Sequence, residues 1–369
     1  MNFDLSEEQE MFRSSVERFA APIDVEARRK LRMHDGGYDR ARWESLAELG
    51  LVALAASEEA GGMGGSPLDL ALVAEAIGKA NAPDPWLELG VLPALLLDRG
   101  GAHGALEKVL SAQSIATFAW TERAQRYSLT AKGTKAERNA DGFLITGEKT
   151  MVLGAALADL FIVTADLDGE TRAFLVASDA EGLDMRPYRL ADGSVAGEIR
   201  LTRVAVGGAA LLDLDADALG AIASEVRLQA AAEMVGLSQR LLDDTLAYVK
   251  EREQFGVPIG SFQVLQHRLV EAYAKIEQSR SMLYRAAMAA RDGGDTAGTG
   301  STDWQRAIAG AKAYIGDNAD AIAREAVQMH GGMGITDELA IGHAMKRVMV
   351  LSRLFGDTDS VLAEYALAA

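Results

Sequence analysis

The sequence predicts an α+β protein with three parts: an N-terminal helical domain at residues 1–112, a middle β-barrel or sandwich domain at 113–212, and a C-terminal four-helix bundle at 213–369. Two observations predict this order. Apolar residues recur at helical spacing in the first and last thirds, whereas the middle third contains short β-branched and aromatic runs between glycine-containing turns. With 369 residues, 49% of them hydrophobic, the chain can bury more than one core.

Helix start signals mark the first third. Ser6 and Gln9 form a capping box ahead of the first predicted helix. A glycine-rich loop later leads to Ser66, which can cap a helix that has Pro67 in its first turn. No strand precedes that loop, so it does not indicate a dinucleotide-binding fingerprint. Further helical stretches are predicted at Trp43–Leu51 and Trp86–Leu110.

The middle third alternates strands with tight turns. Asp141-Gly142 and Asp168-Gly169 are dipeptides typical of short β-hairpin turns. The predicted strands are Ser114–Trp120, Gly142–Thr150, Leu160–Asp166, Thr171–Ala177 and Gly197–Val204.

Long alanine- and leucine-rich helices return in the last third. Ser261 can cap a helix that enters at Phe262. The segment Arg291–Asp303 is polar and glycine-rich, which predicts a mobile connection within the bundle. The predicted helices are Ala221–Glu251, Ser261–Arg291, Asp303–Gln328 and Asp337–Arg353.

Composition excludes several classes of partner. A formal net charge of −17 disfavours nucleic acid and anionic membranes. The chain has no cysteine, and its five histidines show no paired spacing, so no metal site is predicted. The sequence MNFDLSEEQEMF resembles neither a signal nor a transit peptide, and the expected location is the cytoplasm.

Two stretches, Tyr248–Gln266 and Ala326–Thr336, carry the chemistry that a dinucleotide needs. Arg252 follows a predicted helix and offers a planar guanidinium that suits a pyrophosphate. Phe255 can cover a purine face, and the pair Gly331-Gly332 lets backbone amides approach a phosphate without a Cβ in the way.

These stretches closely resemble the C-terminal signature of the acyl-CoA dehydrogenase flavoproteins. The signature positions present are Tyr248, Arg252, Phe255, Gly256, Pro258, Gln263, Gln266, Gln328, His330, Gly331, Gly332 and Gly334. The resemblance implies an FAD shared across a subunit interface, an acyl-CoA substrate and electron-transfer flavoprotein as acceptor. The cofactor-binding residues that it implies are Arg252, Gln254, Phe255, Gln263, Gln328, Gly331, Gly332 and Thr358.

The chain departs from the family on the flavin side. In the stretch 120–128 only the Thr-Glu start of the family's flavin loop survives. Where the family places a flavin-facing Trp or Phe and a Thr or Ser after a Gly-x-Lys, the run after Gly147, Glu148 and Lys149 is Thr-Met-Val-Leu-Gly at 150–154. Gly356 stands where many members carry the glutamate that removes the substrate's α proton.

A minority of the family places this glutamate on an earlier helix, at the position of Val226 here. Glu225 and Asp357 each lie one residue from a family position for the base. On a helix, one residue is a rotation of about 100°, so Glu225 cannot simply replace it. Asp357 stays an alternative base, because a loop at 356–358 could allow it.

The preferred interpretation is one subunit of a mixed acyl-CoA dehydrogenase, in which a homologous partner supplies the base. Heteromers of this type act in bacterial steroid side-chain catabolism, so a steroid CoA ester is a candidate substrate. The alternatives are a self-sufficient flavoenzyme that uses Asp357, a flavin-free scaffold or binding subunit, and a monooxygenase relative that needs no carboxylate base.

Overall fold

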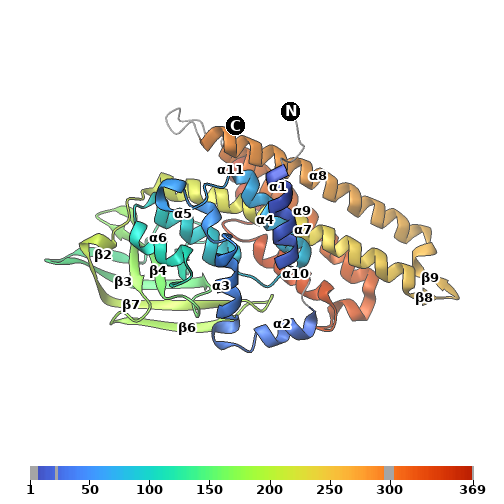
Figure 1. Cartoon of the computed structure of the whole chain (residues 1–369), viewed down its shortest axis with the longest axis horizontal. Coiled ribbons are helices and arrows are strands. Elements are labelled where there is room, and N and C mark those ends of the chain that lie inside the picture. Colours follow the sequence, from blue (N-terminus) through green and yellow to red (C-terminus); the bar gives the residue numbers. More distant parts are fainter. Residues whose placement is uncertain (1–6, 21–23, 295–302, 368–369) are drawn as a thin grey trace. The chain divides into compact units, whose positions relative to one another are not determined.

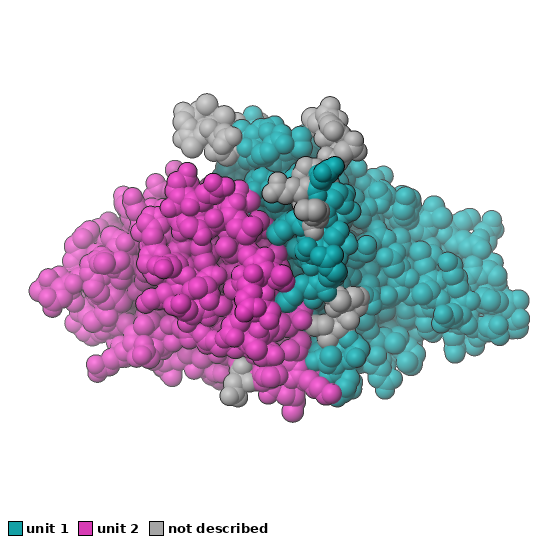
Figure 2. Space-filling view, viewed as in Figure 1, with its two compact units in different colours: residues 1–29, 66–83, 227–369 teal, residues 30–65, 84–226 magenta. Residues whose placement is uncertain are grey.

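The structure is a computed structural model that describes residues 7–20, 24–294 and 303–367. The predicted Ser6 cap and most of the predicted connection, residues 295–302, lie outside this range. Figure 1 shows the elements in chain order, and Figure 2 colours two compact units. Unit 1 comprises residues 1–29, 66–83 and 227–369, and unit 2 comprises 30–65 and 84–226.

Unit 2 contains the β domain and several helices of the first third. The short turns η1 (Asp35–Gly37), η2 (Ala53–Ala55), η3 (Glu58–Ala60) and η5 (Gly208–Ala210) connect its elements. Its helical elements are α3 (Arg40–Glu48), the π-helical turn η4 (Trp86–Val91), α5 (Leu92–Arg99) and α6 (His103–Leu110). Its strands are β1 (Ala116–Ala119), β2 (Lys135–Arg138), β3 (Gly142–Leu153), β4 (Leu160–Leu167), β5 (Glu170–Ala177), β6 (Leu183–Arg189) and β7 (Val195–Gly207).

The seven strands form one hydrogen-bonded sheet in the order β1-β4-β2-β3-β7-β6, with β5 also paired to β4. The β4–β5 hairpin turns at Asp168 and Gly169, both with positive φ, as the sequence predicts. Strands β2 and β6 were not predicted. The first is short and mostly charged, and the second is a polar edge strand that contains Pro187. Neither therefore has the apolar alternation that identifies a half-buried strand.

Unit 1 is helical. Its elements are α1 (Glu7–Phe19), α2 (Val25–Leu31, which reaches the unit boundary), α4 (Pro67–Ala80), α7 (Ala216–Glu251, from residue 227 on), β8 (Glu253–Gln254), β9 (Val257–Pro258), η6 (Ile259–Ser261), α8 (Gln263–Gly294), α9 (Asp303–His330), η7 (Gly331–Ile335), α10 (Ala340–Leu351) and α11 (Thr358–Leu367). The α4 prediction is confirmed, because the Ser66 hydroxyl accepts from the Asp69 amide while the Asp69 carboxylate accepts from Ser66.

Helices α4 and α7 approach each other at two glycines. A Cβ on Gly78 would lie 2.1 Å from the Glu233 carbonyl oxygen, and one on Gly236 would lie 2.0 Å from the Glu75 carbonyl oxygen. Only glycine permits backbones this close. This contact explains why α4, although early in the chain, belongs to the same compact unit as the C-terminal helices.

Three predictions for the last third were wrong in detail. The Ser261 hydroxyl donates to the Pro258 carbonyl within η6, and α8 begins at Gln263. Helix α8 continues to Gly294 despite the polar sequence, and a further helix, α11, follows the predicted bundle. The domain boundaries given above stay a prediction.

Candidate functional site

The two signature stretches meet at an aromatic contact within unit 1. The ring of Tyr248, in the last turns of α7, stacks on the ring of His330 at the end of α9, with centroids 4.2 Å apart and an interplanar angle of 24°. His330 is buried, and its Nδ1 lies 2.8 Å from the Ala326 carbonyl oxygen. The stack therefore brings the corner after α7 next to the Gly331-Gly332 turn.

Arg252 lies at the corner between α7 and the β8–β9 hairpin. Its amide donates to the Tyr248 carbonyl at 2.8 Å, and its carbonyl accepts from the Ile259 amide at 2.8 Å. These bonds fix the backbone on both sides of the corner. The side chain is exposed, and within the described residues its guanidinium has no hydrogen-bond or ion-pair partner. Arg252 thus offers an uncommitted planar cation on a fixed backbone.

Phe255 occupies the tip of this hairpin. It has a left-handed backbone, with φ of 56°, and is followed by Gly256 with φ of 81°. Two successive positive φ values suit a two-residue hairpin turn, where Asn rather than a bulky residue usually precedes glycine. Phe255 is 94% exposed, and its ring lies edge-on to the ring of Phe262 with the two centroids 6.3 Å apart. A strained, exposed aromatic residue of this kind is typical of binding surfaces.

The Gly331-Gly332 turn is open. A Cβ on either glycine would meet nothing within 4 Å, and Gly331 has a left-handed φ of 60°. Gln328 and Gln263 are also exposed, and the side-chain amide of Gln254 donates to the Glu253 carbonyl. With Arg252 and Phe255, this arrangement offers a cation, an aromatic face and a backbone that no Cβ shields at Gly331 and Gly332. These groups fit the adenine and pyrophosphate portion of a dinucleotide such as FAD.

The predicted base position lies at the start of α11, which Figure 1 places away from the hairpin end of the bundle. Gly356 has φ of 132°, and a Cβ there would lie 2.9 Å from both Ser360 Oγ and Val361 Cγ1. Any larger residue at position 356 would therefore be strained and crowded. The local packing thus suits the glycine that the sequence has at this position.

Asp357, the alternative base, caps α11. Its Oδ1 accepts from the Ser360 amide at 3.0 Å, as an N-cap carboxylate does. The next residue, Thr358, donates its hydroxyl to Asp317 Oδ1 at 2.8 Å. Both side chains thus have structural partners, and Figure 1 labels α11 apart from β8 and β9, the hairpin that carries Gln254 and Phe255.

Two buried cations bind the same turn. Arg227 donates from Nε to the Phe355 carbonyl at 2.7 Å and forms a fork with the Glu364 carboxylate. Lys312 Nζ donates to the Ser352 carbonyl at 3.0 Å. Burial, with repulsion from Arg227, lowers the pKa of Lys312 to about 7. The backbone around position 356 is therefore already held by hydrogen bonds from two side chains.

Glu225, the other nearby carboxylate named above, is also committed. Within unit 2, Arg99 donates to both of its carboxylate oxygens, at 2.7 and 2.8 Å. The carboxylate of Glu225 is therefore already committed to a bidentate ion pair with Arg99. Val226, beside it, carries no ionisable group.

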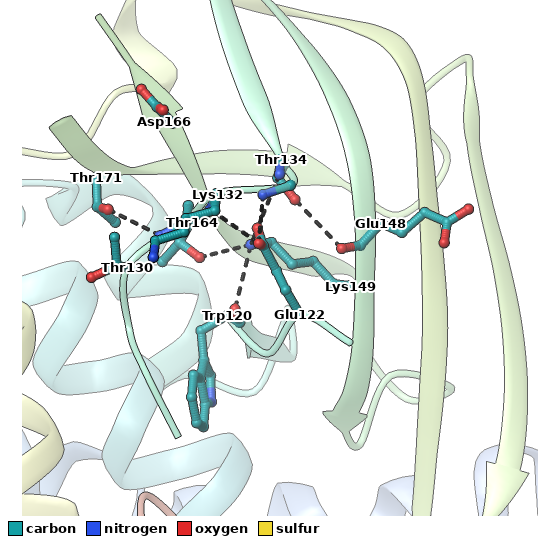
Figure 3. Close-up of polar contacts among 12 residues, drawn as sticks. Trp120, Glu122, Thr130, Lys132, Thr134, Glu148, Lys149, Thr164, Asp166 and Thr171 are labelled. Atoms are coloured by element: carbon teal, nitrogen blue, oxygen red, sulfur yellow. Dashed lines mark hydrogen bonds and ion pairs between the residues drawn. The ribbon is translucent and has the colours of Figure 1, made fainter. Parts of the chain in front are cut away.

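The surviving Thr-Glu and Gly-x-Lys motifs form a buried ion pair in the β domain (Figure 3). Glu122 accepts from Lys149 Nζ at 2.9 Å. The same carboxylate accepts from the amides of Lys132, Gly133 and Thr134 at 2.7–3.0 Å. Burial raises the pKa of Glu122, but the hydrogen bonds from Gly133 and Lys149 outweigh it and bring the pKa to about 2. These motifs therefore hold the loop before β2 against β3.

The pairing of β3 with β7 shifts register between Lys149 and Val152, and the backbone amides at this shift are hydrogen-bonded within the chain. The Met151 amide donates to the Tyr188 hydroxyl at 3.1 Å, and the Thr150 amide donates to the Thr121 carbonyl at 2.9 Å. Sequence reasoning did not identify Tyr188, because a tyrosine in a polar edge strand carries no distinguishing pattern. The backbone amides of Thr150 and Met151 are therefore already hydrogen-bonded within the chain.

In the described part of the chain, His, Asp and Glu side chains form no group of three that could hold a metal ion. Across the same residues, no helix has the length and apolar character needed to cross a membrane.

Comparison with known proteins gives matches over the whole length of the chain. The models for the N-terminal, middle and C-terminal domains of acyl-CoA dehydrogenase match residues 6–112, 117–204 and 218–366. Acyl-CoA dehydrogenase IpdE2 of Mycolicibacterium smegmatis is 32% identical over 360 residues, which cover 95% of this chain and 96% of that protein.

Two solved structures are similar in fold and sequence. A variant of the Tcur3481–Tcur3483 steroid ACAD has a TM-score of 0.86 and 27% identity, covering 98% of this chain and 97% of that one. The ChsE4–ChsE5 complex from Mycobacterium tuberculosis has a TM-score of 0.86 and 26% identity, covering 100% and 98%.

Proposed function

The chain belongs to the acyl-CoA dehydrogenase family, FAD-dependent oxidoreductases that act on CH–CH bonds, and from this premise we propose that it is the base-deficient subunit of a mixed dehydrogenase. In this role it contributes adenine and pyrophosphate contacts to an FAD held mainly by a homologous catalytic partner. The observation that carries the proposal is the exposed Arg252, whose guanidinium has no partner among the described residues, together with the exposed Phe255 and the open Gly331-Gly332 turn.

The other side of the site supports the same division of labour. Position 356 has no carboxylate, and Asp357 and Glu225 are occupied as a helix cap and an arginine partner. In the β domain, the Met151 amide already donates to Tyr188. In this proposal the chain retains groups that suit the cofactor of a neighbouring subunit, and it lacks groups that would catalyse a reaction at a cofactor of its own.

The substrate and partner follow from relatives rather than from the site. The two similar solved structures are named as a Tcur3481–Tcur3483 steroid ACAD variant and as the ChsE4–ChsE5 complex. By analogy, the proposed substrate is an acyl-CoA thioester, with a steroid side-chain CoA ester as candidate, and the proposed acceptor is electron-transfer flavoprotein. FAD supplies the hydride acceptor when bound, and the chain's own residues position its nucleotide end.

Replacing Asp357 by Asn or Ala tests whether this chain supplies the base. In the complex assembled with a homologous, glutamate-bearing partner, turnover is expected to stay within a few-fold of wild type for both variants. The Asn variant can retain the cap on Ser360, so it separates loss of charge from loss of the α11 N-cap. A loss on the order of 10² or more in turnover by both variants would identify Asp357 as the base and favour a self-sufficient enzyme.

A further inference from the structure

The contact between Tyr248 and His330 joins the two halves of the proposed nucleotide site. Tyr248 lies one helical turn before Arg252, and its carbonyl accepts the Arg252 amide. His330 immediately precedes Gly331. The two rings come from segments about 80 residues apart in sequence, yet their centroids are 4.2 Å apart and nearly parallel.

The His330 ring is fixed in place on α9. His330 is only 5% exposed, and its Nδ1 bonds back to the Ala326 carbonyl, which fixes the imidazole on α9. Beyond the stack, α7 ends and the chain leaves as the exposed β8–β9 hairpin. Within the described residues the Arg252 side chain has no partner to orient it, so its placement depends on the backbone that the stack anchors.

From this geometry we infer that Tyr248 and His330 are positioning residues, which set the Arg252 corner at a fixed distance from the Gly331-Gly332 turn so that both can engage one pyrophosphate. The inference rests on the proposed function. Neither ring needs to touch the cofactor, because each acts through the neighbour that follows it in sequence. Stacking, and not the phenol hydroxyl, is the property that matters.

A double-mutant cycle between Tyr248 and Arg252 tests this role. The dissociation constant of FAD is measured for the complex assembled with a glutamate-bearing partner, carrying Tyr248→Leu, Tyr248→Phe, Arg252→Ala, or Tyr248→Leu with Arg252→Ala. Tyr248→Phe is expected to bind FAD within about twofold of wild type, because it keeps the ring. Tyr248→Leu is expected to weaken binding about three- to tenfold, the range that an aromatic pair supports.

The decisive result is the absence of additivity. If Tyr248 acts through Arg252, Tyr248→Leu changes the dissociation constant by less than about twofold once Arg252 is Ala. An equal effect in both backgrounds, or no effect in either, overturns the positioning role. A general loss of folding is recognised from the melting temperature of the flavin-free complex. Should Tyr248→Leu fail to fold, His330→Leu serves in the same cycle with the same expected lack of additivity.

The same measurements distinguish a failure of the proposed function from a failure of this inference. If Arg252→Ala alone leaves FAD binding unchanged, the corner does not hold the cofactor and both statements fall. If Arg252→Ala weakens binding but the Tyr248 effect is additive to it, only the positioning role is wrong.

Discussion

Replacing Arg252 by Ala is expected to weaken FAD binding to the assembled complex by about ten- to a hundredfold. The substitution removes a charge-assisted fork onto an anion, which contributes on the order of 1.5 to 3 kcal/mol. Because a ligand that binds the native state stabilises it, the melting temperature of the complex at fixed FAD concentration should fall as well. The flavin-to-protein ratio of the co-purified complex is the direct measurement.

Arg252→Lys is the matched control for charge. An ammonium keeps the positive charge but cannot form a bidentate planar contact, so binding should recover only in part. The competing view, a solvated arginine at a helix C-terminus, predicts a change of a few tenths of a kcal/mol in helix stability and no change in flavin content. An unchanged flavin ratio in Arg252→Ala would show that this view is right.

Replacing Glu122 by Gln is expected to reduce the free energy of unfolding by about 3 to 5 kcal/mol. The variant leaves the Lys149 ammonium, which is fully buried, without its counter-charge. Denaturant unfolding of the purified chain measures the loss. In the double variant Glu122→Gln/Lys149→Met both charges are gone, and the loss should be smaller than for Glu122→Gln alone. A loss below about 1 kcal/mol in the single variant would contradict this assignment.

The same pair gives the stability a defined pH dependence. The pKa of Glu122 is lowered from 4.5 to about 2, so its contribution is fully present above pH 4.5 and is lost as the pH falls towards 2. Burial, opposed by Glu122, lowers the pKa of Lys149 from 10.5 to about 8. Between about pH 8 and pH 10.5, Lys149 is more often protonated in the unfolded chain than in the folded one. The free energy of unfolding therefore rises with pH in this range, and Lys149→Met should abolish the rise.

Much of the fold could be predicted because its long elements repeat their pattern many times. Helices α7, α8 and α9 each extend over many turns, and the apolar strands β4 and β5 flank an Asp-Gly turn. Elements without such a pattern were missed. Strand β2 is held by its pairing with β3, and α11 begins at a cap, Asp357, that sequence reasoning had considered only as a base.

The candidate site divides in the same way. Local chemistry identified Arg252 and Phe255, and the structure places both at an exposed corner. The stacking of Tyr248 on His330 depends on how α7 packs beside α9, which spacing along one helix does not reveal. Sequence reasoning regarded Glu122 as the remnant of a flavin loop, but its three amide donors and Lys149 make it an internal anchor.

The central claim is that FAD is bound only where this chain meets a homologous partner that carries the catalytic glutamate. It is tested most directly by titrating FAD into the purified chain, into the partner alone, and into their equimolar mixture, followed by the visible flavin spectrum and acyl-CoA turnover. The account predicts no tight binding and no turnover by this chain alone, and both in the mixture. A yellow, active protein formed by this chain by itself would contradict it.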